Sequence, residues 1–261
     1  TVLAETSAPS RWLSIAEAEG WLVVVPNGYG VDDGDGLGNR QTWNDLRPSV
    51  GNPISEEDDA GFIAAVVEHE VDRRGADASS VFVTGSSNGG MMAYRMLIEY
   101  PDRFAAGGAF IANLPEIDVP EPDIARPIVI VNGDADPLMP WSGGGVGFNG
   151  APVRSGPATV AWWRSVHDVD AVPPTSELLP DVTPGDGTTV LRVAWGEPGG
   201  PPPVVLYRVM GGGHSIPVLP TDPQLDLPPW LGVRCGDVRG VDLAYEFFAS
   251  RRPARPSDAS H

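Results

Sequence analysis

Residues 81–97 read Val81-Phe-Val-Thr-Gly85-Ser-Ser87-Asn-Gly89-Gly-Met-Met-Ala-Tyr-Arg-Met-Leu97. A β-branched run ends in Gly-Xaa-Ser-Xaa-Gly and is followed directly by the apolar spacing of a helix. Strand, sharp turn and helix in this order are the setting in which a serine is raised from a sheet edge as a nucleophile. We therefore expect a strained backbone at Ser87, with Gly85 and Gly89 leaving room for neighbouring chain. The alternative is a Ser/Gly-rich turn without chemistry.

The same serine stands at the start of the predicted helix. Unpaired N–H groups and the positive end of the helix dipole favour negative charge at that position. We expect the amide of Asn88 to bind the oxyanion that forms when Ser87 attacks a carbonyl group.

A serine hydroxyl is a weak nucleophile, so the chain must supply a base. His214 has the expected setting, because it follows a predicted core strand at 204–210 and the glycine run 211–213. The glycines are expected to let the imidazole swing towards Ser87. The other histidines are expected to be solvated surface residues: His69, His167 and His261.

The base in turn needs an orienting acid, and the order Ser, Asp, His along the chain is that of α/β-hydrolases. A strand-like run at 127–132 leads into Gly133-Asp134-Ala-Asp136-Pro. Both aspartates lie at the carboxyl end of this predicted strand, and the spacing does not choose between them. One of the two is expected to cap the turn.

Composition limits the function classes. The chain has 261 residues, 41% of them hydrophobic, which suits one folded core. A net charge of −18 repels phosphate backbones and anionic lipids, so nucleic-acid binding is disfavoured, and the apolar runs are too short to span a membrane. The single Cys235 excludes a disulfide within the chain. The acidity, with no lysine present, reflects either genomic base composition or adaptation to salt.

Short apolar runs alternate with longer amphipathic stretches, which predicts an α/β fold with a mostly parallel sheet. We expect one domain at 1–250, a flexible tail at 251–261, and long surface loops at 28–53 and 172–203. The predicted strands are 21–26, 80–84, 105–111, 127–132, 189–195 and 204–210. The predicted helices are 10–19, 57–74, 89–99, 158–167 and 241–249.

Four segments, 85–93, 132–144, 211–217 and 241–248, together resemble the polyhydroxybutyrate depolymerase and feruloyl esterase-like family of α/β-hydrolases. The resemblance covers about residues 11–249. It implies an α/β-hydrolase fold with helices on both faces of the sheet. It also implies a triad of Ser87, His214 and the aspartate directly before the proline, which selects Asp136 over Asp134.

The chain departs from the family pattern in three places. Asn132-Gly133 replaces the family's His-Gly pair, and the family's cysteine pairs are absent. In the family, a strand and a His-Gly loop with the second oxyanion donor precede the segment equivalent to 10–28. Their counterparts here would lie upstream of Thr1, so we expect the first strands and this donor to be missing or replaced.

Three apolar side chains are candidates for the substrate pocket. Trp43 lies in a long loop on the expected active-site side, and Trp141 follows the acid loop directly. Ile216 stands where the family often has a tryptophan. Either tryptophan could clamp an ester or equally anchor its loop, whereas Trp162 and Trp163 are expected to pack. No metal-ligand spacing, dinucleotide fingerprint or phosphate loop is present, so no cofactor is expected.

These observations predict a serine hydrolase that cleaves carboxylic esters through an acyl-enzyme. By resemblance, its substrates are short-chain acyl esters, polyhydroxyalkanoates or other polyesters, or feruloyl and acetyl esters. Resemblance also implies secretion. The alternatives are a peptidase or acyltransferase on the same triad, or a catalytically silent or truncated fold used for binding.

Overall fold

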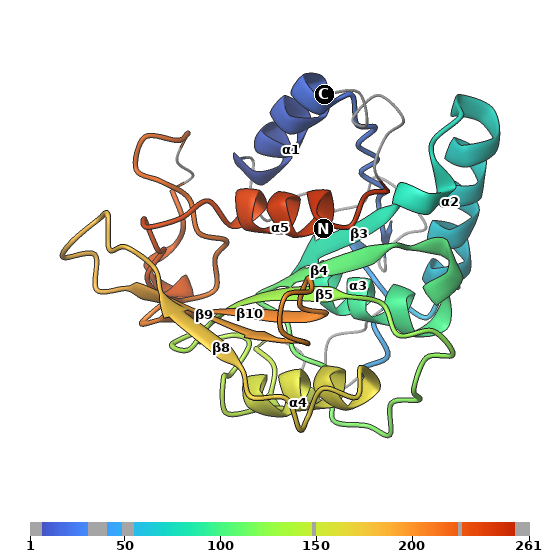
Figure 1. The fold of residues 1–261 in the computed structure, drawn as a ribbon. Coiled ribbons are helices and arrows are strands. Elements are labelled where there is room, and N and C mark those ends of the chain that lie inside the picture. Colours follow the sequence, from blue (N-terminus) through green and yellow to red (C-terminus); the bar gives the residue numbers. More distant parts are fainter. Residues whose placement is uncertain (1–6, 31–40, 49–54, 148–149, 224–225, 254–261) are drawn as a thin grey trace.

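The computed structural model describes residues 7–30, 41–48, 55–147, 150–223 and 226–253. In these ranges a six-stranded sheet lies between two groups of helices (Figure 1). Its strands are β3 Phe82–Ser86, β4 Ala106–Phe110, β5 Ile128–Gly133, β8 Thr175–Leu178, β9 Thr189–Trp195 and β10 Val204–Met210. The helices are α1 Ser7–Glu19, α2 Asp59–Arg74, α3 Asn88–Glu99, α4 Gly156–Val166 and α5 Gly240–Ala249. Shorter elements are β1 Tyr29–Gly30, β2 Gln41–Thr42, β6 Gly144–Gly145, β7 Pro152–Val153, η1 Ala78–Ser80, η2 Pro101–Arg103 and η3 Pro229–Leu231.

The order of the strands in the sheet is β3-β4-β5-β10-β9-β8. Neighbours from β3 to β10 run parallel, with Val129 of β5 beside Gly108 of β4 and Val205 of β10. The pairs β10-β9 and β9-β8 are antiparallel. The predicted mostly parallel α/β sheet is thereby confirmed. Because parallel strands end at the same edge, the loops after β3, β5 and β10 meet there.

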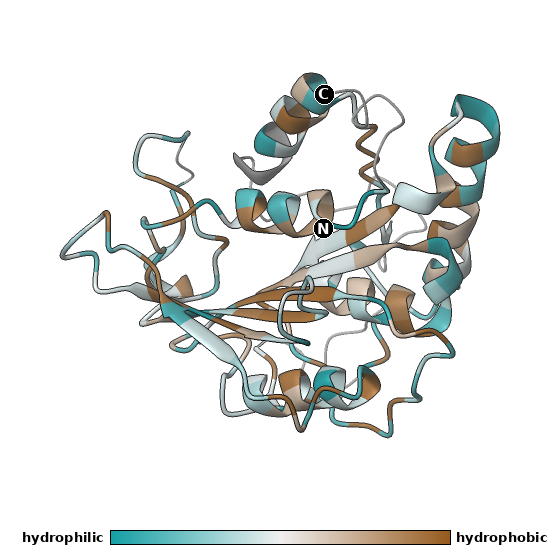
Figure 2. Cartoon of the chain, viewed as in Figure 1, coloured by the Kyte–Doolittle hydropathy of each residue, from teal (hydrophilic) through white to brown (hydrophobic). Residues whose placement is uncertain are grey.

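Side chains alternate across the sheet and divide the core into two layers. Ile128 and Ile130 of β5 pack with α2, α3 and α4, whereas Val129 and Val131 pack with α1 and α5. Figure 2 shows the apolar strands in the middle and hydrophilic residues on the outer faces of the helices. None of the described helices has the length and apolarity that crossing a membrane requires.

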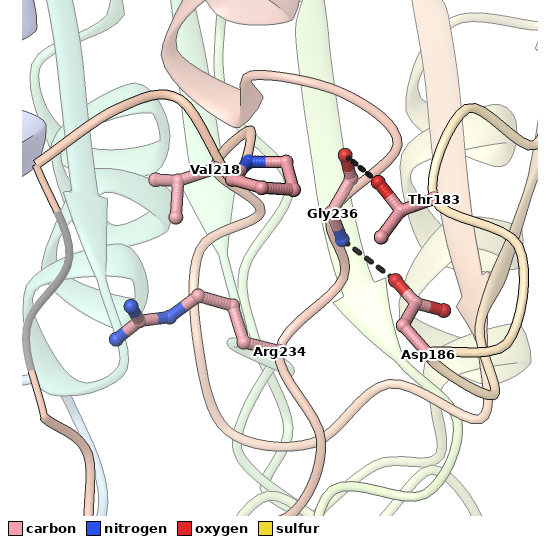
Figure 3. A pocket seen from close by; sticks show the side chains of 6 residues that line it. Thr183, Asp186, Val218, Arg234 and Gly236 are labelled. Atoms are coloured by element: carbon pink, nitrogen blue, oxygen red, sulfur yellow. Dashed lines mark hydrogen bonds between the residues drawn. The ribbon is translucent and has the colours of Figure 1, made fainter.

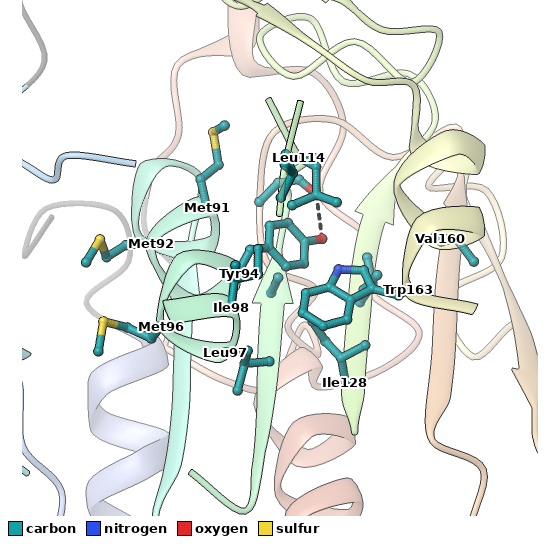
Figure 4. Close-up of a cluster of buried hydrophobic side chains, with 14 of the residues drawn as sticks. Met91, Met92, Tyr94, Met96, Leu97, Ile98, Leu114, Ile128, Val160 and Trp163 are labelled. Atoms are coloured by element: carbon teal, nitrogen blue, oxygen red, sulfur yellow. Dashed lines mark hydrogen bonds between the residues drawn. The ribbon is translucent and has the colours of Figure 1, made fainter. Parts of the chain in front are cut away.

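The first layer is built around two large aromatic side chains (Figure 4). Trp163 is fully buried, and its ring lies 5.8 Å from that of Tyr94, centre to centre. The hydroxyl of Tyr94 donates a hydrogen bond of 3.0 Å to the carbonyl of Ala112, which satisfies it in the core. Trp162 is half-buried and meets Trp163 edge to face at 4.8 Å. Both tryptophans pack, as predicted.

Residues 21–26 do not form the predicted strand. Their side chains are only partly sheltered: Trp21 stacks on Phe82 at 5.5 Å, but Leu22 and Val25 are 46% and 58% exposed. Within the described residues β3 pairs only with β4, and no strand pairs with 21–26. β-Branched residues favour extended backbone, but a strand also needs a neighbour for its N–H and C=O groups.

The predicted loop at 172–203 contains the predicted strand 189–195, which is β9, and also β8, which was not predicted. All four residues of β8 are exposed and its sequence Thr-Ser-Glu-Leu is polar, as suits a strand at a sheet edge. In the other predicted loop, 28–53, β1 pairs with β2, while 31–40 and 49–54 lie outside the described residues.

Most of the predicted tail also lies outside the described residues, which end at 253. The first residue of the tail, Arg251, lies 3.3 Å from the ring centre of Phe247 and donates a hydrogen bond to its carbonyl. Burial lowers the pKa of this guanidinium to about 10.

His167 caps the C-terminal end of α4 and is half-buried, so its predicted solvated position is wrong. Its Nε2 lies 3.0 Å from the carbonyl oxygen of Arg126, the geometry of an Nε2–H donor. Burial lowers the pKa of His167 below its ordinary value, because the neutral ring is preferred inside the protein.

The lowered pKa of His167 predicts that this residue makes the folded protein less stable at acid pH. Below a pH of about 6.5 the unfolded chain takes up a proton that the folded chain resists, so the free energy of unfolding falls as pH falls. We expect His167→Gln to show a smaller drop in Tm between pH 7.5 and pH 5 than the wild type. The exposed His69→Gln is the matched control and should keep the wild-type drop. An unchanged drop in His167→Gln, measured by scanning fluorimetry, would contradict this.

Candidate active site

Ser87 lies at the turn between β3 and α3, with φ 53° and ψ −121°. Positive φ is costly for a residue with a side chain, so this backbone is strained as predicted. The amide of Ser87 donates to the carbonyl of Phe110 on the neighbouring strand at 2.9 Å, and its own carbonyl accepts from Met91 at 3.0 Å. These bonds hold the turn, and the side chain is left at the carboxyl edge of the sheet.

Close packing explains two of the glycines around this turn. A Cβ on Gly85 would lie 2.3 Å from the carbonyl oxygen of Gly89, and one on Gly90 would lie 2.7 Å from Cβ of Ala112. A Cβ on Gly89 would meet Trp43 at an ordinary 3.9 Å. The crowding that we expected at Gly89 is therefore found at Gly90, where α3 packs against the chain after β4.

Asp136 lies in the loop after β5, and its carboxylate is buried, with 1% of the side chain exposed. Oδ1 accepts the amides of Leu138 and Met139, each at 2.8 Å. Oδ2 lies 2.7 Å from Nδ1 of His214. Two backbone N–H groups and the imidazole of His214 thus contact this carboxylate.

His214 follows β10 and the run Gly211–Gly213, and its side chain is 10% exposed. Its Nε2 lies 3.0 Å from Oγ of Ser87. With a proton on Nδ1 directed to Asp136, Nε2 is free to accept the proton of the Ser87 hydroxyl. The structure thus brings Ser87, His214 and Asp136 into one continuous chain of hydrogen bonds.

The glycine run before His214 is crowded. A Cβ on Gly211 would lie 2.3 Å from the carbonyl oxygen of Gly187, and one on Gly213 would lie 2.2 Å from that of Leu231. The amide of His214 donates to the same Leu231 carbonyl at 2.6 Å. We expected glycine to provide mobility here, but it permits close contact between loops, and the imidazole is already in place.

The backbone amide and the side chain of Asn88 have different roles at the site. Its amide belongs to the first turn of α3, where N–H groups have no acceptor within the helix. Its side chain forms two hydrogen bonds to the backbone of the loop after β2. Oδ1 accepts from the Trp43 amide at 2.7 Å, and Nδ2 donates to the Trp43 carbonyl at 2.9 Å. Nδ2 also donates to Asp45, which forms a buried ion pair of 2.6 Å with Arg47. Asp45 is a supporting residue that the sequence reasoning missed.

The three predicted pocket residues have different surroundings. Trp43 and Ile216 are each 5% exposed, Trp43 in the layer of α2 and α3, and Ile216 against α5. These surroundings favour packing roles for both. Trp141 is half-buried at the end of the acid loop, with the guanidinium of Arg208 5.1 Å from its ring centre. Trp141 therefore remains the candidate for substrate contact.

Asn132 stands where the family resemblance places a histidine. Its Oδ1 accepts the amide of Ala112 at 3.0 Å, and its Nδ2 donates to the Ala112 carbonyl and to Asn113 at 2.9 and 3.0 Å. These bonds hold the chain after β4 beside the acid loop, so an amide side chain fills this position without unpaired groups.

Possible metal ligands gather elsewhere. Within the described ranges, ligand atoms of Asp186, Cys235 and Asp237 lie within 4.8 Å of one another. Asp186 accepts the amides of Thr188 and Gly236, and burial raises the pKa of the Cys235 thiol, which favours its protonated form. These contacts tie two loops together.

A cavity of about 240 Å³ adjoins these loops (Figure 3). It is lined by Thr183, Asp186, Val218, Pro220, Arg234 and Gly236, and no triad residue lies in its wall.

Parts of this chain are similar in sequence to known esterases, to a depolymerase and to a peptidase family. The sequence pattern of the prolyl oligopeptidase family matches residues 13–120, a range that includes Ser87. The esterase-named protein NocK of Nocardia uniformis subsp. tsuyamanensis is 30% identical over 66% of this chain and 51% of its own length. Poly(3-hydroxyalkanoate) depolymerase C of Paucimonas lemoignei is 27% identical over 81% of this chain and 51% of its own. Feruloyl esterase B of Neurospora crassa is 42% identical over 39% of this chain and 32% of its own. The chain thus spans about half the length of the first two relatives.

Proposed function

We propose that this chain, which has the α/β-hydrolase fold and is similar to feruloyl esterases and poly(3-hydroxyalkanoate) depolymerases, hydrolyses carboxylic esters through Ser87, His214 and Asp136. One observation carries the proposal: a chain of hydrogen bonds of 2.7 and 3.0 Å joins the three side chains across 127 residues of sequence. The strained turn at Ser87 and its place as the N-cap residue of α3 add support.

In the proposed mechanism Oγ of Ser87 attacks the ester carbonyl while its proton passes to Nε2 of His214. Asp136 holds the Nδ1–H tautomer and stabilises the imidazolium. The Asn88 amide donates to the tetrahedral oxyanion. The intermediate then expels the alcohol, which takes the proton from His214 and leaves an acyl-serine. Water attacks the acyl-serine by the same steps and releases the carboxylic acid.

The substrate class follows from the relatives and not from the triad. Their names point to feruloyl esters and poly(3-hydroxyalkanoates), and acetyl or other short-chain acyl esters are equally compatible with the proposed chemistry. The net charge of −18 disfavours strongly anionic substrates. We also propose that the protein is secreted, because it resembles depolymerases and feruloyl esterases.

A peptidase is the second candidate, because the matching family pattern is that of prolyl oligopeptidases. A p-nitrophenyl ester and the p-nitroanilide of the same acyl group separate the two functions. We expect ready cleavage of the ester and no detectable cleavage of the anilide, since an amide has a poorer leaving group that needs dedicated protonation. Cleavage of both at similar kcat/KM would favour the peptidase. Cleavage of neither would favour a catalytically silent fold.

A further inference from the structure

We propose that Asp134 is a positioning residue of the site: it fixes the glycine run that carries His214 and, through Arg208, the indole of Trp141. The proposal rests on the proposed function, because the imidazole that it positions is the proposed base. Asp134 lies two residues before Asp136 in the loop after β5.

The carboxylate of Asp134 joins the end of β10 to the start of the glycine run. Its Oδ1 accepts the amide of Gly211 at 2.7 Å. Its Oδ2 accepts Nε of Arg208 at 2.9 Å and lies 2.7 Å from Nη2 of the same guanidinium. The side chain of Asp134 is 15% exposed and that of Arg208 is 38% exposed, so the ion pair is partly open to solvent while the carboxylate itself is largely sheltered.

The position of these bonds determines where His214 lies. Gly211 has φ +76° and begins the turn that brings the chain back over the sheet edge. Two backbone bonds reinforce the side chain: the Asp134 amide donates to Val209, and the Ala135 amide to Gly212, each at 3.0 Å. Of the bonds between the two loops, the one from the Gly211 amide to the Asp134 carboxylate is the one with a charged acceptor. These bonds therefore join the acid loop to the base loop.

Asp134 also differs from an aspartate that only caps its own turn. A capping aspartate accepts amides a few residues away, as Oδ1 of Asp136 does with Leu138 and Met139. The partners of Asp134 lie 74 and 77 residues further along the chain. This carboxylate therefore acts between segments, and the two aspartates have separate tasks.

The same ion pair reaches the candidate substrate residue. Arg208 lies between Asp134 and Trp141, with its guanidinium 5.1 Å from the centre of the indole. A cation at this distance from a tryptophan ring is attracted to it, and the pairing with Asp134 fixes the cation in place. Loss of Asp134 would release Arg208 and with it one support of Trp141.

The test compares Asp134→Ala with the wild type on a p-nitrophenyl ester. A displacement of about 1 Å at a reacting group costs about 100-fold in rate, so we expect kcat to fall between about 10- and 100-fold. Asp134→Asn keeps an oxygen for the Gly211 amide and should recover kcat to within about tenfold of the wild type. Asp77→Ala is the matched control, because Asp77 also accepts an amide and hydroxyls, from Ser79 and Ser80, at η1. It should leave kcat unchanged.

A second readout does not depend on turnover. In the wild type, the Nδ1–H proton of His214 is bonded to Asp136 and should give a low-field NMR signal, assigned by its loss in His214→Ala. We expect this signal to broaden or move upfield in Asp134→Ala and to stay in place in Asp77→Ala. A folded Asp134→Ala with wild-type kcat and an unchanged signal would overturn the proposal. If Asp134→Ala does not fold, Asp134→Leu takes its place, because leucine fills the space of the carboxylate but accepts no hydrogen bond from Gly211 or Arg208. Wild-type kcat and an unchanged signal in folded Asp134→Leu would also overturn the proposal. If the wild type cleaves no ester, the proposed function fails, but the NMR comparison still tests Asp134.

Discussion

Replacing His214 with alanine is expected to lower kcat for a p-nitrophenyl ester by about 10⁴-fold or more, because triad members act as a unit. Without the imidazole, the Ser87 hydroxyl loses Nε2, the acceptor 3.0 Å from its Oγ that takes up its proton. Residual turnover would come from substrate binding and the Asn88 amide. The measurement is steady-state kinetics on protein whose fold is checked by circular dichroism.

His69→Ala serves as the matched control for that result. His69 is an exposed residue of α2, and its replacement should leave kcat near the wild-type value. A loss of less than about tenfold in folded His214→Ala would contradict the assignment of this histidine as the base.

Asp136→Asn is expected to lower kcat by about 10⁴-fold through the tautomer of His214. The amides of Leu138 and Met139 require an acceptor, so the oxygen of the new side chain would stay with them. The amide nitrogen would then face Nδ1 of His214 as a donor. Nδ1 would become an acceptor and Nε2 would carry the proton, so Nε2 could not accept a proton from Ser87.

Asp134→Asn is the natural comparison for this substitution, because sequence spacing alone left the two aspartates equivalent. It should stay within about tenfold of the wild type, since its partners are Gly211 and Arg208 and not the imidazole. If Asp134→Asn lost more activity than Asp136→Asn, the roles of the two aspartates would have to be exchanged.

Buried elements were the most predictable from sequence. The strands at 189–195 and 204–210 have the predicted bounds; β10 is largely buried, whereas most residues of β9 are half-buried. The run at 21–26 has the same appearance and forms no strand, since pairing depends on a partner that local sequence does not specify. β8 was missed for the opposite reason: it is held by β9 at a sheet edge and needs no apolar face.

The site was predictable where chemistry requires particular residues in particular settings. The Gly-Xaa-Ser-Xaa-Gly turn and the histidine after a late strand were enough to choose Ser87 and His214, whose side chains do meet. The choice of Asp136 needed the family resemblance. The burial of Trp43 and Ile216 could not be predicted from the sequence. Burial of a loop side chain depends on contacts with distant segments, such as the bonds between Asn88 and the Trp43 backbone.

The most direct test of the central claim is labelling of the folded chain with a fluorophosphonate, followed by peptide mapping of the adduct. Ser87 activated by His214 should carry the label, and labelling in His214→Ala should be slower by orders of magnitude while His69→Ala reacts as the wild type does. A label on a different serine, or ester turnover that persists with Ser87 unlabelled, would contradict the claim that Ser87 is the nucleophile.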